Sequence, residues 1–222
     1  MYYIRIRLTS FKQNCYIVWC KKTLCAAIID PGNSSNITNI ISYLLSKYKL
    51  LIKIILITHC HLDHISTAYV LSKKYHIPII GSHEDDIVLI KNLKLQAMYF
   101  KLPYCIYKDN NWVQHKQSIF LGKILFIAYH CPGHTPGHVI YYNQTTNILI
   151  SGDILFTNSI GRTDFPYSNY LQLLTSIKRY ILPLNSQTLI LPGHEKPIYL
   201  FKIKKYNQYI IKILTNNNID YI

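Results

Sequence analysis

The side chains best suited to chemistry gather in one short segment, Thr58-His59-Cys60-His61-Leu62-Asp63-His64, which places three imidazoles and a carboxylate within six residues. Side chains alternate along an extended backbone, so His59 and His61 are expected to face one ion, while Asp63 and His64 enter the next bend and can face a second. Imidazoles and carboxylates are common ligands of zinc and other divalent metals in proteins. The spacing therefore predicts a metal site.

Three further donors, His134, Asp153 and His194, stand beside glycines or prolines, which let the backbone turn tightly after a strand. Together the donors amount to five imidazoles and two carboxylates, more than one tetrahedral zinc ion with an open position requires. We therefore predict two ions about 3.5 to 4 Å apart that share a bridging water or hydroxide. With Asp153 bridging, the predicted ligands are His59, His61, His134 and Asp153 for the first ion and Asp63, His64, His194 and Asp153 for the second.

Such a site predicts hydrolysis by a metal-bound hydroxide, because zinc lowers the pKa of bound water to about 7. No Ser or Cys nucleophile with a partner His is evident in the sequence. A thioester is the favoured substrate, because a thiol with a pKa of about 8.5 leaves as a thiolate without a strong acid. We predict that Asp63 is catalytic and orients the nucleophile while it binds the second ion. Cys60 and Cys131 are predicted to be packed thiols.

The elements that must position these donors follow from the hydrophobic patterning. Strands are predicted at residues 2–8, 14–20, 24–30, 52–57, 79–80, 117–121, 124–130, 138–143, 147–151 and 188–191. Helices are predicted at 37–48, 66–75, 84–91, 170–181 and 199–214, while 92–112 shows no clear pattern. Each donor motif directly follows a predicted strand. We expect two sheets covered by helices in a single domain over 1–215, with a frayed tail at 216–222.

Composition limits the class of protein. The formal net charge is +14, but 20 of the 24 basic residues are lysines and they are scattered along the chain, which argues against a nucleic-acid partner. No apolar run approaches the roughly 20 residues of a membrane span, and no signal peptide is recognisable, so no membrane partner is expected. The six cysteines form no C-x-x-C pair, which predicts reduced thiols and a cytoplasmic location.

The donor motifs resemble those of the metallo-β-lactamase-fold hydrolases, and other stretches are most similar to the short bacterial type II glyoxalases. Those stretches are Ser10–Cys15, Asp30-Pro31-Gly32, Cys131–His138, Gly161–Pro166 and Leu191–His194. The resemblance implies an α+β fold, a four-layer αβ/βα sandwich with the active site at the edge between two sheets. It also implies hydroxyacylglutathione hydrolase activity, which converts S-D-lactoylglutathione to glutathione and D-lactate in methylglyoxal detoxification. The implied cofactors are two divalent metal ions per chain. Zinc is the favoured metal, and iron and manganese are the alternatives.

The same resemblance implies roles for two more residues. His138 would form a hydrogen bond behind the ligands, and we group it with Asp63 as catalytic. Arg162 would bind the glutathione part of the substrate; the alternative is that Arg162 pairs with Asp164 or a loop carbonyl. The sequence departs from the family pattern at four positions that are not ligands, namely Ser66, Thr67, Tyr167 and Glu195.

Three alternatives stay open. The first is a mononuclear-iron persulfide dioxygenase on the same fold, in which His59, His134 and Asp153 would form the triad of two His and one carboxylate that such iron chemistry uses. The second is a metal-dependent nuclease, and the third is a binding module whose site has decayed. The sequence does not decide between a monomer and a homo-oligomer.

Overall fold

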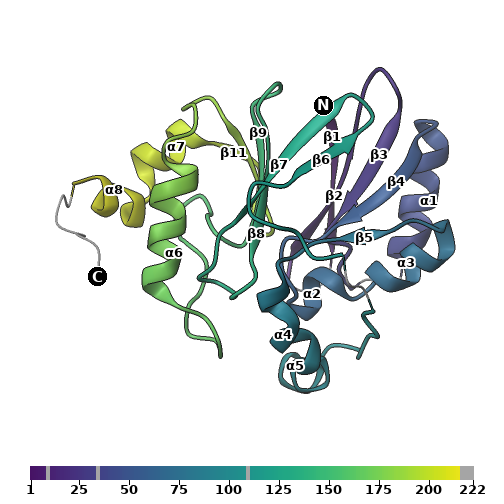
Figure 1. Cartoon of the computed structure of the whole chain (residues 1–222), viewed down its shortest axis with the longest axis horizontal. Helices are drawn as coiled ribbons and strands as arrows, with labels where there is room; N and C mark the ends of the chain where they lie inside the picture. Colours follow the sequence, from purple (N-terminus) through teal and green to yellow (C-terminus); the bar gives the residue numbers. More distant parts are fainter. Residues whose placement is uncertain (9–10, 34–35, 109–110, 216–222) are drawn as a thin grey trace.

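Two β-sheets face each other in the middle of the molecule, and helices cover their outer sides (Figure 1). The structure is a computed structural model that describes residues 1–8, 11–33, 36–108 and 111–215. The first sheet has the order β1-β2-β3-β4-β5, with β1 Tyr2–Leu8, β2 Gln13–Trp19, β3 Cys25–Ile29, β4 Leu51–Leu56 and β5 Ile79–Ile80. The second has the order β11-β10-β9-β8-β7-β6, with β6 Ser118–Leu121, β7 Ile124–His130, β8 Val139–Asn143, β9 Ile148–Gly152, β10 Leu189–Pro192 and β11 Ile198–Tyr199.

The helices fall into three groups. Those on the outer side of the first sheet are α1 (Ile37–Lys47) and α3 (Ala68–Tyr75). Those on the outer side of the second sheet are α6 (Tyr170–Ser176), a π-helical turn at Ile177–Ile181, α7 (Leu200–Tyr206) and α8 (Gln208–Thr215). At the lower end of the view in Figure 1 lie α2 (Leu62–Ile65), a 3-10 turn at Glu84–Asp86, α4 (Ile87–Lys91) and α5 (Leu93–Phe100).

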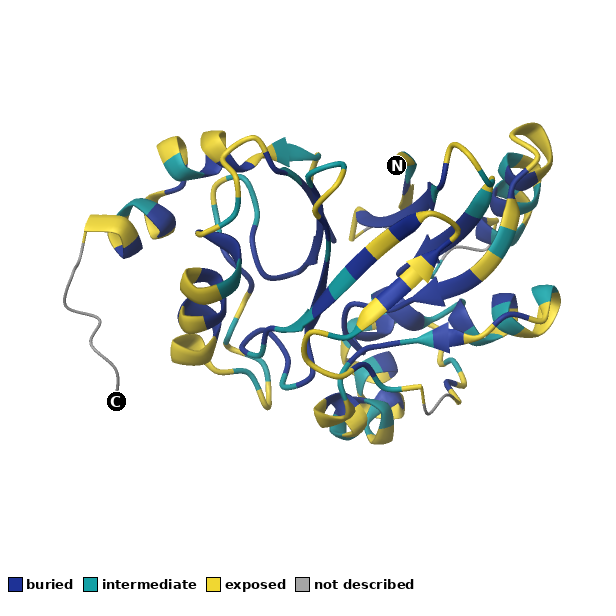
Figure 2. Cartoon of the chain, turned by 45° about the horizontal axis from the view of Figure 1, so that its top comes forward, coloured by how far each residue is buried: buried dark blue, intermediate teal, exposed yellow. Residues whose placement is uncertain are grey.

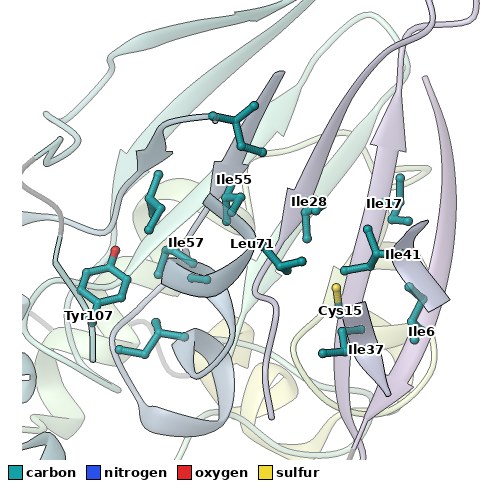
Figure 3. Packing of buried hydrophobic residues seen from close by; sticks show 14 of the residues in the cluster. Ile6, Cys15, Ile17, Ile28, Ile37, Ile41, Ile55, Ile57, Leu71 and Tyr107 are labelled. Atoms are coloured by element: carbon teal, nitrogen blue, oxygen red, sulfur yellow. The ribbon is translucent and has the colours of Figure 1, made fainter. Parts of the chain in front are cut away.

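The four layers follow from the alternation of side chains along the strands. In β2, Tyr16 and Val18 belong to the buried cluster between the two sheets, together with Phe126 of the second sheet. Ile17 instead joins the cluster between the first sheet and its helices, where Ile41 also packs (Figure 3). A third cluster joins the second sheet to its own helices. Burying each such side chain contributes about 1.5–3 kcal/mol.

The helices are amphipathic, as Figure 2 shows by the alternation of buried and exposed residues along them. In α1, Ile37, Ile41 and Leu45 are buried at helical spacing. In the described parts of the chain, every helix is too short or too polar to cross a bilayer.

The predicted strands and the two-sheet architecture are confirmed, but the helix predictions need three corrections. The predicted helix 66–75 is confirmed as α3, but the short helix α2 just before it was not predicted, and the unassigned stretch 92–112 contains α5. The predicted helix 199–214 starts with β11 and is divided at Asn207, whose Oδ1 accepts a hydrogen bond from Tyr209 N–H at 3.0 Å and so caps α8. The tail predicted at 216–222 lies outside the described residues.

Candidate metal centre

The seven predicted donors lie in the segments that directly follow four strands. The segment His59–His64 comes after β4 and leads into α2, while His134 follows β7. Asp153 and His194 follow β9 and β10, which run parallel, so their carboxyl ends deliver both residues to the same edge of the sheet. Residues far apart in the chain are thereby brought to one place.

The loop that carries His59 and His64 is anchored by the buried carboxylate of Asp30. One oxygen of Asp30 accepts a hydrogen bond from Thr58 N–H at 2.8 Å, and the other accepts from Thr58 Oγ1 at 2.6 Å. Asp30 Oδ2 also lies 3.0 Å from His64 Nδ1, and Thr58 Oγ1 lies 3.0 Å from His59 Nδ1. With Nδ1 engaged in both rings, Nε2 is the nitrogen left to bind a metal.

His59, His61 and His134 form the first donor group, whose ligand atoms lie within 4.8 Å of one another. The three rings are nearly perpendicular in pairs, with interplanar angles of 85°, 78° and 80°. Burial lowers the pKa of all three, to about 3 for His61, where the neighbouring His134 adds to the effect. These imidazoles are therefore neutral and present lone pairs at physiological pH.

Asp63, His64 and His194 form the second donor group, also within 4.8 Å. Asp63 Oδ2 lies 3.7 Å from His64 Nε2 and 3.4 Å from His194 Nε2. Burial lowers the pKa of His194, but the carboxylates of Asp153 and Asp63 outweigh burial and raise that pKa to about 11. The second group therefore differs from the first in that it combines carboxylates with a histidine that holds a proton in the metal-free protein.

Asp153 connects the two groups. Its Oδ2 lies 3.6 Å from His134 Nε2 in the first group and 3.4 Å from His194 Nε2 in the second. Its Oδ1 lies 3.6 Å from His64 Nε2. The placement is the one expected of a carboxylate shared by two ions. Space for it depends on Gly193, because a Cβ on that residue would collide with Asp153 Oδ1.

The unsatisfied atoms of the cluster test whether metal ions fit. His59 Nε2, His64 Nε2 and Asp153 Oδ1 are buried and have no hydrogen-bond partner among the described residues. A buried polar atom without a partner costs about 1–3 kcal/mol, so such atoms are rare unless something else binds them. All three belong to the donor groups, and their chemistry suits divalent cations. The site fits divalent metal binding.

His138 lies behind the donors rather than beside the cavity. Its Nε2 accepts a hydrogen bond from Asp153 N–H at 3.0 Å, and its ring stacks on His59 with centroids 4.9 Å apart. Its side chain is fully buried and is not part of the cavity wall. The predicted hydrogen bond behind the ligands is therefore present, and it joins His138 to Asp153 rather than to the cavity.

A cavity of about 680 Å³ opens over the cluster. Five donors line it, namely His61, Asp63, His134, Asp153 and His194. Arg162 also lines it, yet its guanidinium forms two hydrogen bonds to Asp164, from Nε at 2.9 Å and from Nη2 at 2.7 Å. The alternative stated for Arg162, pairing with Asp164, is therefore present in the structure. Arg162 remains beside the cavity while it forms this pair.

Besides Asp30, two further residues hold the donor loops without having been predicted to do so. The buried Asp86 carboxylate accepts hydrogen bonds from Cys60 N–H at 2.8 Å and Gly137 N–H at 2.6 Å, within the two loops that carry the first donor group. Asn14 donates to the carbonyls of Pro192 and Glu195 at 2.9 and 2.7 Å, on both sides of His194. Asn14 lies in a stretch that supports the family resemblance, whereas the sequence around Asp86 carries no recognisable signal.

Comparison with known proteins agrees with this geometry. A model of the metallo-beta-lactamase superfamily matches residues 8–194. The hydroxyacylglutathione hydrolase GloC of Haemophilus influenzae is 36% identical over 207 residues, which cover 92% of this chain and 96% of that protein. The structure of the BLEG-1 B3 metallo-beta-lactamase matches with a TM-score of 0.85 at 29% identity and covers 94% of this chain and 99% of that one. TTHA1623, solved in a di-iron-bound form, matches with a TM-score of 0.81 at 28% identity and covers 93% and 99%. These similarities confirm the predicted fold.

Proposed function

The chain belongs to the metallo-β-lactamase superfamily, and on that premise we propose that it hydrolyses the thioester of S-D-lactoylglutathione to glutathione and D-lactate. The observation that carries this proposal is the similarity to GloC, which extends over nearly the full length of both chains. A metal-dependent hydrolase also agrees with the five donors that line a single cavity.

The chain offers one ligand set for each of two ions. His59, His61 and His134 would hold the first ion, Asp63, His64 and His194 the second, and Asp153 both. When bound, the ions activate a water molecule as nucleophile and polarise the thioester carbonyl. We propose zinc as the native metal. Iron is the main alternative, because the similar protein TTHA1623 was solved in a di-iron-bound form.

Asp63 is the residue best placed to orient the attacking water. Its side chain is 20% exposed and lines the cavity. Burial raises the pKa of Asp63, but the neighbouring His64 and His194 outweigh burial and keep that pKa below its usual value. Asp63 is therefore an anion that accepts a hydrogen bond from water at neutral pH. The thiol product has a pKa of about 8.5 and leaves as a thiolate, so no acid is needed opposite Asp63.

Arg162 is the residue we propose for binding a carboxylate of glutathione. Its side chain is 63% exposed at the mouth of the cavity. The bonds to Asp164 use Nε and Nη2, and Nη1 takes part in neither. Stacking of the guanidinium carbon 4.3 Å from the centre of the Phe165 ring holds the group in place. A positioned guanidinium of this kind suits a carboxylate ligand.

The decisive experiment combines metal analysis with a thioester assay on the purified, metal-loaded protein. We expect two divalent ions per chain and turnover of S-D-lactoylglutathione, with both metal content and turnover reduced in His134→Ala and Asp153→Ala. A protein with two zinc ions and no thioesterase activity would overturn the proposal. So would one iron per chain together with oxygen consumption on glutathione persulfide, which is the outcome expected of a dioxygenase.

A further inference from the structure

Two of the six cysteines face each other at the end of the hairpin formed by β2 and β3. The register of this antiparallel pair places Trp19 opposite Ala26. The next step along both strands places Cys20 opposite Cys25, and Cys20 N–H donates to the Cys25 carbonyl oxygen at 2.9 Å. Opposite residues in antiparallel strands have Cα atoms about 4.5–5.5 Å apart, which is within the roughly 4.4–6.8 Å that a disulfide spans.

The two side chains point to the same side of the sheet. Cys20 belongs to the buried cluster between the two sheets and is 4% exposed. Cys25 packs against the same cluster and is partly exposed. Both thiols are free. The strand register therefore already brings the two thiols to the positions from which a disulfide can form.

Hydrogen bonds to the Cys20 sulfur favour its thiolate form. The Thr23 hydroxyl donates to the sulfur, and the backbone N–H groups of Lys123, Thr23 and Lys22 add to this effect. Together they outweigh burial and lower the pKa of Cys20 to about 7. At pH 7.5 the Cys20 side chain is therefore mainly a thiolate, which is the nucleophilic form of cysteine.

The cysteines outside this hairpin turn hold their protons at neutral pH. Cys15, Cys60 and Cys131 are fully buried, and burial raises the pKa of all three. Burial also raises the pKa of Cys105, to about 11. Cys15 lies on β2, but its side chain belongs to the cluster on the other face of the sheet. Cys20 is therefore distinguished from these four by its thiolate character and by the second thiol opposite it.

The pair lies at the opposite end of the first sheet from the donor groups. β3 begins at Cys25 and ends at Ile29, next to Asp30, which anchors the donor loop. Five steps along a strand at about 3.3 Å each separate Cys25 from Asp30 by roughly 16 Å. In Figure 1 the turn between β2 and β3 is at the top of the first sheet, whereas α2, which carries Asp63 and His64, is at the bottom. Chemistry at the pair is therefore separate from that of the metal centre.

We propose that Cys20 and Cys25 form an oxidation site, a dithiol that hydrogen peroxide converts to a disulfide within the hairpin. Hydrogen peroxide suits the site because it is hardly larger than water and the Cys20 side chain is almost completely covered.

The reaction has two steps. The Cys20 thiolate attacks one peroxide oxygen, the O–O bond breaks, and the hydroxide that leaves takes up a proton to become water. The Cys25 sulfur then attacks the Cys20 sulfenic acid, so that the S–S bond forms and a second water leaves with the Cys25 proton. The two thiols lose two electrons and the peroxide gains them.

The test uses the zinc-loaded protein at pH 7.5, because zinc undergoes no redox chemistry. Once reductant has been removed, hydrogen peroxide should cause the loss of two hydrogens from the intact mass, and dithiothreitol should restore them. Trypsin cleaves after Lys21 and Lys22, so a digest without reductant should contain peptide 13–21 linked to peptide 23–47. The mass loss and the link should both be absent from Cys20→Ala and Cys25→Ala.

Cys15 provides the matched control, because it lies on the same strand as Cys20 and in the same tryptic peptide. Cys15→Ala should be oxidised like the wild type and keep the link. Thr23→Val removes the hydroxyl that donates to Cys20, so the midpoint of its profile of oxidation rate against pH should lie above the wild-type value of about 7.

Four results would overturn the proposal. The first is a protein that keeps all its thiols while free glutathione in the same solution is oxidised. The second is the gain of oxygen atoms without the link. The third is a link that Cys15→Ala removes or that joins two chains. The fourth is the same pH profile in Thr23→Val as in the wild type.

Discussion

The donor groups at the cavity can be compared with another cluster of the same side-chain types, formed by His83, Asp85 and His130. The ligand atoms of this cluster also lie within 4.8 Å of one another. Asp85 Oδ2 is 3.2 Å from His83 Nδ1 and 3.6 Å from His130 Nε2. The residue types and the distances between ligand atoms therefore do not distinguish this cluster from the donor groups at the cavity.

The orientation of the imidazole rings distinguishes the cluster of His83, Asp85 and His130 from the first donor group. The His83 and His130 rings are stacked 3.9 Å apart with an interplanar angle of 7°, whereas the rings of the first donor group are nearly perpendicular. The lone pair of an imidazole nitrogen lies in the ring plane, so two parallel rings cannot direct their lone pairs at one ion. His130 Nε2 instead donates a hydrogen bond to the carbonyl oxygen of Pro136 at 2.7 Å. Convergent lone pairs, rather than a count of donors, distinguish a metal site.

The largest effect is expected from Asp153→Asn, which keeps the shape of the shared carboxylate but removes its charge. Both donor groups lose a ligand, because Asp153 lies within 3.6 Å of nitrogens in each. We expect kcat/KM on the lactoyl thioester to fall by on the order of a thousandfold and metal content to fall below two per chain. Metal analysis and steady-state kinetics measure both. Two firmly bound ions in the variant would show that the groups do not share Asp153.

A smaller effect is expected from Asp86→Ala, which removes the acceptor for the N–H groups of Cys60 and Gly137. The two donor loops then lose a common anchor, and support of this kind is worth about 10–100-fold in metal affinity or activity. Competition with a chelator gives the metal affinity. Asp85→Ala is the matched control, because Asp85 is the adjacent residue and its side chain is half exposed. Equal affinities in the two variants would contradict the role of Asp86.

Proton release distinguishes the two donor groups from each other. His194 has a pKa raised to about 11 in the metal-free protein, because the Asp153 and Asp63 carboxylates outweigh burial. It therefore holds a proton at pH 7.5 and must release it when a metal binds, whereas the first group is neutral. Calorimetric zinc titrations in two buffers of different ionisation enthalpy should show about one more proton released per chain in the wild type than in His194→Ala, beyond the protons that metal-bound water gives up in both. Equal release in the two proteins would assign the proton to another group.

The sequence singles out seven candidate donors, which the structure brings together, because they carry strong chemical and positional signals. The segment His59–His64 is dense in metal ligands, and His134, Asp153 and His194 each follow a predictable strand beside Gly or Pro. The strands themselves were predictable because side chains on both of their faces are buried. Each strand therefore stands out as a short run of hydrophobic residues.

The supporting residues were not predictable in the same way. Asp86 lies among Glu84 and Asp85, and nothing in an acidic turn shows which carboxylate is buried. The stretch containing α5 has no distinct amphipathic pattern, because Leu95, Met98 and Tyr99 are all exposed. Which residue bonds to which loop depends on tertiary contacts that local periodicity does not encode.

The smallest effect is expected from substitutions in the cluster of His83, Asp85 and His130, whose two histidine rings are stacked. His130→Ala and His83→Ala should leave two metals per chain and change kcat/KM by no more than about twofold, because neither side chain lines the cavity that holds the donors. His134→Ala, four residues further along the chain from His130, is the contrasting variant and should lose metal and activity. Metal analysis after equilibration with excess zinc provides the sharpest measurement. A third zinc in the wild type that His130→Ala removes would show that the stack opens to bind metal, and proximity would then matter more than ring orientation.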